Sequence, residues 1–152
     1  MPSVDGLGDD AIRQILTSVR TIAVVGASPN PARPSNDVLG VLIDRGFETF
    51  PVNPFHAGAL IRGRPVSARM ADVPAPIEMV DVFRNSAAAG DVVDEALRLD
   101  PLPRVIWMQV GVINEEAARR ARAQGVTVVM NRCPAIELRR LFPPGFMSPT
   151  GR

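Results

Sequence analysis

The sequence predicts an α/β fold in which a doubly wound parallel sheet of about five strands is covered by helices on both faces. Short apolar, β-branched runs alternate with segments whose apolar residues recur at helical spacing. The runs are apolar throughout, as strands buried on both faces should be. We see no internal repeat and no linker, so we expect a single domain over residues 10–142 and a flexible C-terminal tail over residues 143–152.

The first part of the chain reads as helix, strand, helix, strand. Gly26 ends the first strand, and Ser35 is the expected N-cap of the second helix, which Gly46 stops. We expect these four elements at residues 10–19, 21–25, 34–46 and 47–52.

The rest of the chain continues the alternation after an irregular crossover over residues 55–76, which holds a short strand at 60–61 and a helical turn near 68–72. Asn114 caps the fourth helix, with Glu115 and Glu116 in its favourable first turn. We expect strands at 79–83, 104–110 and 126–130, and helices at 91–99 (starting a few residues earlier), 114–124 and 134–142.

Parallel strands end at one edge of their sheet, and ligands bind there at the switch point of the strand order. We expect the order 3-2-1-4-5, with the switch point between the first and fourth strands. The loops to inspect are then 26–35, 52–54, 83–86, 109–114 and 131–134.

Composition excludes several classes of function. The chain has 152 residues, 46% of them hydrophobic, and a net charge of +1 from which no nucleic-acid or membrane partner is expected. All 17 basic residues are arginine. One cysteine, no signal peptide and no apolar run near ~20 residues point to a soluble cytoplasmic protein.

The first loop, within V-V-G-A-S-P-N-P-A-R-P-S, lacks the second and third glycines of a dinucleotide-binding turn. It offers Gly26, two hydroxyls at Ser28 and Ser35, the forked cation of Arg33, and a helix start that favours anions. These features predict a phosphate site. The plain alternative is a capped strand–helix connection with a solvated arginine.

The end of the second strand, Val52-Asn53-Pro54, lacks the acidic residue that holds the ribose hydroxyls of NAD. Asn53 can bond to a sugar or simply shape the turn. Ordinary NAD binding loses support here.

Two single residues have chemistry of their own. His56, the only histidine, has no nearby ligand or triad pattern, so we interpret it as a solvated loop residue. Cys133 precedes Pro134 at a helix start, where a thiol can be reactive, although a small buried turn residue explains it as well. The spacings give no Ser-His-Asp, Cys-His or paired-carboxylate arrangement.

Five segments in combination are more specific than any one of them: V-V-G-A-S-P-N-P-A-R-P-S, F-P-V-N-P, M-V-D-V-F-R, V-I-W-M-Q-V-G-V-I-N-E-E-A and V-V-M-N-R-C-P. Together they resemble the small bacterial and archaeal CoA-binding proteins. These are single Rossmann-like domains similar to the N-terminal CoA-binding domain of the succinyl-CoA synthetase alpha subunit. The resemblance runs from about residue 12 to residue 142.

The resemblance implies coenzyme A, or an acyl-CoA, as the cofactor. It implies that the phosphate loop consists of Gly26, Ala27, Ser28, Arg33 and Ser35. It implies that the nucleotide is flanked by Val52, Asn53 and Pro54, and that its adenine side is lined by Phe83 and Arg84. It also implies that the pantetheine arm runs along Met108, Gln109 and Gly111 and ends near Asn131 and Cys133. The missing acid then makes sense, because the ribose phosphate of CoA repels a carboxylate.

One departure limits the resemblance. The phosphorylated histidine of the synthetase belongs to a second domain with no counterpart in this sequence, so ligase activity gains no support. We therefore expect a non-catalytic carrier, sensor or subunit module, with a homodimer or a protein partner left open. The alternatives are an NADP-binding oxidoreductase-type domain, in which Arg33 or Arg62 serves the extra phosphate, and a thiol-dependent enzyme using Cys133.

Overall fold

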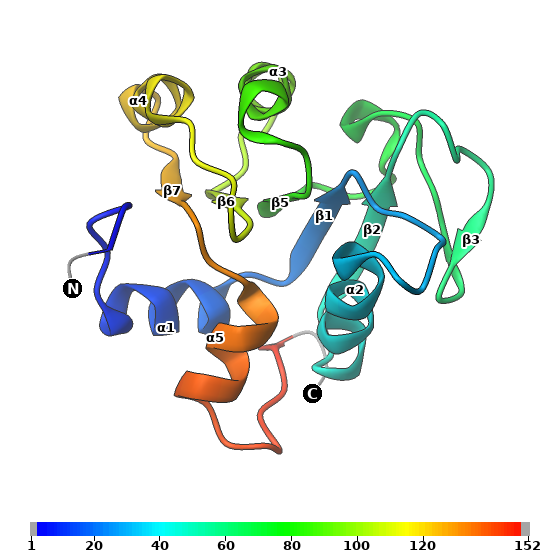
Figure 1. Ribbon diagram of the computed structural model, residues 1–152, viewed down its shortest axis with the longest axis horizontal. Coiled ribbons are helices and arrows are strands. Elements are labelled where there is room, and N and C mark those ends of the chain that lie inside the picture. Colours follow the sequence, from blue (N-terminus) through cyan, green and yellow to red (C-terminus); the bar gives the residue numbers. More distant parts are fainter. Residues whose placement is uncertain (1–2, 150–152) are drawn as a thin grey trace.

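The computed structural model describes residues 3–149 and confirms the α/β class, with a five-stranded parallel sheet between two helical layers (Figure 1). The elements in chain order are α1 (Asp9–Ser18), β1 (Thr21–Val25), α2 (Pro34–Asp44), β2 (Glu48–Val52), β3 (Leu60–Ile61), β4 (Arg64–Pro65), the 3-10 helix η1 (Met70–Asp72), β5 (Met79–Val82), α3 (Ser86–Leu97), β6 (Val105–Met108), α4 (Glu115–Ala123), β7 (Thr127–Val129) and α5 (Pro134–Leu141).

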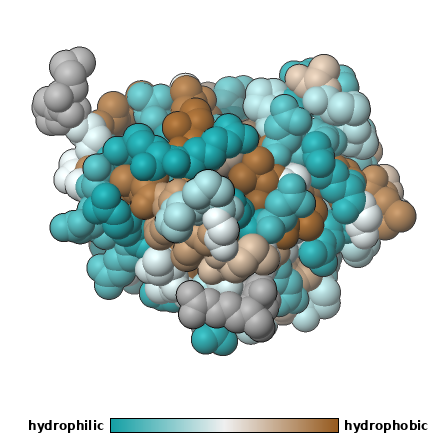
Figure 2. Space-filling view, turned by 90° about the horizontal axis from the view of Figure 1, so that it is seen from below, coloured by the Kyte–Doolittle hydropathy of each residue, from teal (hydrophilic) through white to brown (hydrophobic). Residues whose placement is uncertain are grey.

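The core lies in two clusters, one on each face of the sheet. Strand side chains alternate between faces, so Ile22 and Val24 of β1 pack under α1, α2 and α5, while Ala23 and Val25 pack under α3 and α4. The two layers are visible above and below the sheet in Figure 1. The α1–α2–α5 side, seen from below in Figure 2, shows small exposed apolar patches among polar ones. No helix within residues 3–149 has the length and apolar character needed to cross a bilayer.

The predicted strand order is wrong. The sheet runs β2-β1-β5-β6-β7, so the third long strand pairs with the first, from Ile22↔Met79 to Val25↔Val82. The crossover after β2 contributes Met70 and Ile77 to the α3–α4 side of the core, and thus brings the chain back past β1. Both orders have parallel strands, and the apolar pattern does not distinguish them. The switch point therefore lies between β1 and β5, and the same loops surround it.

The start of α2 differs in detail from the prediction. Ser35 is not the N-cap: Arg33 holds that position with an extended backbone, and Pro34 is the first helical residue. The fixed φ of proline suits this first position, which places Ser35 one residue inside the helix. At α4, by contrast, Asn114 is the N-cap as predicted, and its side chain accepts the N–H of Ala117.

The C-terminal segment contacts the domain within its described part. The ring of Phe146 stacks on Phe142 with 4.3 Å between centroids, and the Ser148 N–H donates to the Arg45 carbonyl at 2.8 Å. Residues 150–152 lie outside the described residues, and the flexible tail over 143–152 stays a prediction.

A buried ion pair joins the N-terminal segment to the turn before α5. The Asp5 carboxylate accepts from Arg132 Nε at 2.9 Å and from the Met130 N–H at 3.1 Å. Its side chain is fully buried, and that of Arg132 is 12% exposed. Burial alone would raise the pKa of Asp5, but hydrogen bonds from Arg132, Leu7 and Met130 outweigh it and hold the pKa below its ordinary value.

Candidate functional site

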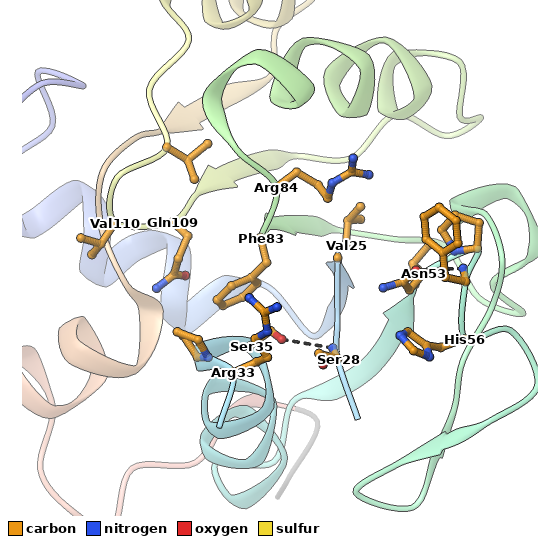
Figure 3. Close-up of a pocket in the computed structure, with 16 residues that line it drawn as sticks. Val25, Ser28, Arg33, Ser35, Asn53, His56, Phe83, Arg84, Gln109 and Val110 are labelled. Atoms are coloured by element: carbon orange, nitrogen blue, oxygen red, sulfur yellow. Dashed lines mark hydrogen bonds between the residues drawn. The ribbon is translucent and has the colours of Figure 1, made fainter. Parts of the chain in front are cut away.

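A cavity of about 690 Å³ opens at the carboxyl ends of the strands, around the switch point between β1 and β5 (Figure 3). The loops that follow β1, β2, β5 and β6 all contribute to it. Asn53 and His56 lie at one end and Gln109 and Val110 at the other, with Phe83 between them. The predicted site residues that line it are Gly26, Ser28, Arg33, Ser35, Val52, Asn53, Pro54, Phe83, Arg84 and Gln109.

Gly26 is required by the contact between two strand ends. Its φ is +88°, and a Cβ there would lie 2.7 Å from the carbonyl oxygen of Phe83. Its N–H donates to the Val52 carbonyl at 2.9 Å. Gly26 therefore holds the ends of β1, β2 and β5 together, and only a glycine fits this conformation and space.

The two serine hydroxyls of the first loop have their geometry fixed by the loop itself. Ser35 Oγ accepts the Ser28 N–H at 3.1 Å, and Ser28 Oγ accepts the Asn30 N–H at 3.1 Å. Each hydroxyl keeps its own proton to donate. The loop thus offers two oriented O–H donors at the cavity wall, whereas the N–H groups of Ser28 and Asn30 are already in use.

Asn53 joins the first loop to the second. Its Nδ2 donates to the Ala27 carbonyl at 2.9 Å, and its Oδ1 accepts the Phe55 N–H at 2.9 Å. Ala27 is fully buried and does not line the cavity. Of the two roles open for Asn53, shaping the turn is the one that these contacts support.

The cavity is electropositive. Neither Arg33 nor Arg84 forms an ion pair or a side-chain hydrogen bond with any residue in the range 3–149, and no aspartate or glutamate lines the cavity. In Figure 3, Arg33 rises from the start of α2 toward Phe83, and Arg84 lies on the other side of that ring. Two guanidinium groups without carboxylate partners favour an anionic ligand with forked oxygens.

The remaining predicted residues lie elsewhere. Met108 is fully buried in the core. Asn131 has a φ of +59°, and its Oδ1 accepts the Gly111 N–H at 2.8 Å, so these two residues meet beside the cavity rather than in its wall. Cys133 is buried and faces an adjoining hollow that Gln109 also lines.

Part of the cavity lining was not predicted from the sequence, namely Val25, Pro34, Phe55, His56, Val110 and Val112. Phe55 is 86% exposed, and an aromatic residue directly after the N-P turn was the available signal. His56 belongs to the wall as well. No group of three or more His, Cys, Asp or Glu side chains within the described ranges is placed to hold a metal ion.

The chain is similar to several known proteins. The model of the CoA binding domain family matches residues 20–139. The uncharacterized protein YneT of Bacillus subtilis (strain 168) is 38% identical over 122 residues, which cover 80% of this chain and 87% of YneT. A hypothetical protein from Pyrococcus horikoshii OT3 superposes with a TM-score of 0.86 at 38% identity, covering 93% of this chain and 96% of that one.

A larger protein carries the same fold as one part of its chain. The dinucleotide-forming acetyl-coenzyme A synthetase 1 of Ca. Korarchaeum cryptofilum, in complex with phosphate and ADP, matches with a TM-score of 0.64 at 26% identity. The match covers 80% of this chain but 27% of the synthetase.

Proposed function

The chain belongs to the CoA binding domain family, and on that premise we propose that the cavity at the switch point binds coenzyme A or an acyl-CoA, without catalysing a reaction. The observation that carries the proposal is the pair of arginines, Arg33 and Arg84, that face a cavity free of carboxylates. We further propose that the protein works as a carrier, a sensor or a subunit module in the cytoplasm.

The lining residues fit the parts of this ligand. Arg33 and the hydroxyls of Ser28 and Ser35 supply charge and donors for the diphosphate. The walls at Asn53 and Phe83 take the nucleotide, with Arg84 available for the ribose phosphate. The pantetheine arm then extends toward Gln109, at the opposite end of the cavity from Asn53 (Figure 3).

Two alternatives make different demands on the same cavity. An NADP-binding domain would also use an arginine for its extra phosphate, and a thiol enzyme would need an accessible Cys133. The comparisons support neither, and Cys133 is 7% exposed. The NADP alternative is an outcome of the experiment below.

The test is calorimetric titration of the ligand-stripped protein with CoA, 3′-dephospho-CoA and NADP. We expect CoA to bind, and each of Arg33→Ala and Arg84→Ala to weaken it about ten- to a hundred-fold, since a hydrogen bond to a charged group contributes about 1.5–3 kcal/mol. If Arg84 binds the ribose phosphate, Arg84→Ala will change the affinity for 3′-dephospho-CoA little.

The matched control is Arg119→Ala, an exposed arginine on α4 outside the cavity, which should leave the affinity unchanged. Binding of NADP with no heat from CoA would overturn the proposal in favour of a hydride carrier. Equal affinities for CoA in all three variants would show that the arginines do not hold the phosphates.

A further inference from the structure

A second hollow of about 430 Å³ adjoins the cavity, between α2 and α5. We call it the side groove. Its walls are mostly apolar and include Val38 and Val41 from α2 and Ile136 from α5, with the buried Cys133 beside them. Such a volume lies within the usual range of small-molecule pockets, about 300–1,000 Å³.

The side groove continues the main cavity. Pro34, Gln109 and Val110 line both hollows, so a ligand that leaves the cavity past Gln109 enters the groove. This is the end of the cavity opposite Asn53 (Figure 3). A ligand with its nucleotide near Asn53 therefore has its far end directed at the groove.

The side-chain amide oxygen of Gln109, at the junction, lacks a hydrogen-bond partner among the described residues. The residue is 8% exposed, and its Oε1 is buried with no donor among the described residues. A buried amide oxygen without a partner is costly, and a turn of the Gln109 amide toward the hollow that it lines would let a ligand N–H satisfy it. The pantetheine arm of CoA carries amide N–H groups of the required kind.

The groove also leaves apolar surface uncovered at its mouth. Val110 is 57% exposed and Ile136 is 52% exposed, and most of the other residues that line the groove are small or aliphatic. Two charged residues, Asp37 and Arg139, line it as well and are exposed. An apolar chain entering from the cavity would remove this surface from water, which is favourable in proportion to its area.

We infer that the side groove holds the acyl chain of an acyl-CoA, so that the ligand is a thioester with an apolar acyl group rather than free CoA. The arm amide donates to Gln109 Oε1, the thioester lies near Cys133, and the chain lies between α2 and α5. This inference rests on the proposed function of the main cavity. It assigns binding only and involves no covalent step.

The experiment compares free CoA, acetyl-CoA, hexanoyl-CoA and succinyl-CoA by calorimetry or by displacement of a bound fluorescent CoA analogue. Each methylene that is buried strengthens binding about four-fold. We expect hexanoyl-CoA to bind at least ten-fold more tightly than free CoA, acetyl-CoA to lie close to free CoA, and succinyl-CoA to gain nothing from its charged end.

Ile136→Asp should abolish the preference for hexanoyl-CoA while leaving the affinity for free CoA unchanged. Leu60→Asp is the matched control, because Leu60 is 65% exposed on β3 and lines neither hollow; it should retain the preference. Gln109→Leu should weaken CoA about ten-fold but not adenosine 3′,5′-bisphosphate, which lacks the arm.

The outcomes separate the two claims. If no CoA species binds, the proposed function fails. If free CoA binds and hexanoyl-CoA is no tighter, or if Ile136→Asp keeps the preference, the groove does not hold the acyl chain and this inference alone is overturned. Tighter binding of succinyl-CoA than of hexanoyl-CoA would likewise overturn the apolar assignment.

Discussion

Asp81 is a carboxylic acid buried within the sheet. In the register of β5 it lies between Val24 of β1 and Trp107 of β6. The residue is fully buried, and neither carboxyl oxygen has a hydrogen-bond partner among the described residues. Burial therefore raises the pKa of Asp81 well above its ordinary value, because the charged form would lose its hydration without compensation.

The raised pKa makes stability depend on pH in a defined direction. The unfolded chain ionises Asp81 near its ordinary pKa of 3.8, while the folded protein keeps the proton. Below pH 3.8 the carboxyl group is protonated in both states. Above pH 3.8 only the unfolded chain releases the proton, so the free energy of unfolding falls by about 1.4 kcal/mol per pH unit until the folded pKa is reached. Asp81→Asn should thus raise the free energy of unfolding at neutral pH.

Urea denaturation of the wild type and Asp81→Asn between pH 5 and pH 8 measures this effect. The difference in free energy of unfolding between the two proteins should grow with pH up to the raised pKa of folded Asp81 and level off above it. A constant difference over that range would show that Asp81 is ionised in the folded state.

At the scale of elements, two asparagine caps fix the helices that follow β5 and β6. Asn85 accepts the Ala88 N–H at 2.8 Å at the start of α3, and Asn114 accepts the Ala117 N–H at 3.0 Å at the start of α4. Asn114 has a second role, because its Nδ2 donates to the Ser86 carbonyl at 2.9 Å. This bond ties the two helix starts together beside the site.

The additional hydrogen bond of Asn114 to the Ser86 carbonyl predicts that the two cap substitutions reduce stability by different amounts. Loss of an N-cap side chain costs about 0.5–2 kcal/mol. Asn85→Ala should fall within that range, and Asn114→Ala should exceed it by about 1 kcal/mol because a further hydrogen bond is lost. Thermal and urea unfolding of both variants would give the comparison, and equal costs would mean that the Ser86 contact contributes nothing.

The helices and strands also show how much of the fold can be predicted from the sequence. Apolar runs, and glycines at the ends of strands and helices, were enough to predict all five strands of the parallel sheet. Asn114 was enough to predict where its helix begins. The order of the strands was missed because it depends on which face the crossover over residues 55–76 covers, and Met70 and Ile77 have no period that reveals a face. In the site, Val110 was missed because a loop residue after a strand gives no sign of the direction of its side chain, whereas the aromatic Phe55 after the N-P turn was a signal that went unused.

At the scale of the whole molecule, the pair of Asp5 and Arg132 closes the chain on itself across 127 positions of sequence. Arg132 also contacts Glu137 of α5 at 3.3 Å and donates to the Leu7 carbonyl at 2.7 Å. The pair therefore holds the N-terminal segment against the turn that carries Cys133. Removing one partner of a buried pair costs about 3–5 kcal/mol, and without Asp5 the Arg132 charge would keep, among residues 3–149, only its contacts with Glu137 and the Leu7 carbonyl.

Asp5→Ala should lower the free energy of unfolding by about 3–5 kcal/mol at pH 7. The folded pKa of Asp5 is lowered, so its stabilising contribution is present above the ordinary carboxyl pKa and is lost as pH falls through the folded value. The difference between wild type and variant should therefore shrink in strong acid. Asp10→Ala, which removes a solvent-exposed carboxylate, serves as control, and a difference independent of pH would contradict the ion-pair account.

The arginines of the cavity have a consequence for the chemical lifetime of what they hold. All 17 basic residues of the chain are arginine, so no lysine amine stands near the ligand. A thioester transfers its acyl group to amines and thiolates, whereas a guanidinium stays protonated and is not a nucleophile. A bound acyl-CoA would therefore meet no lysine amine, and Cys133 is the one thiol of the chain to which its acyl group could pass.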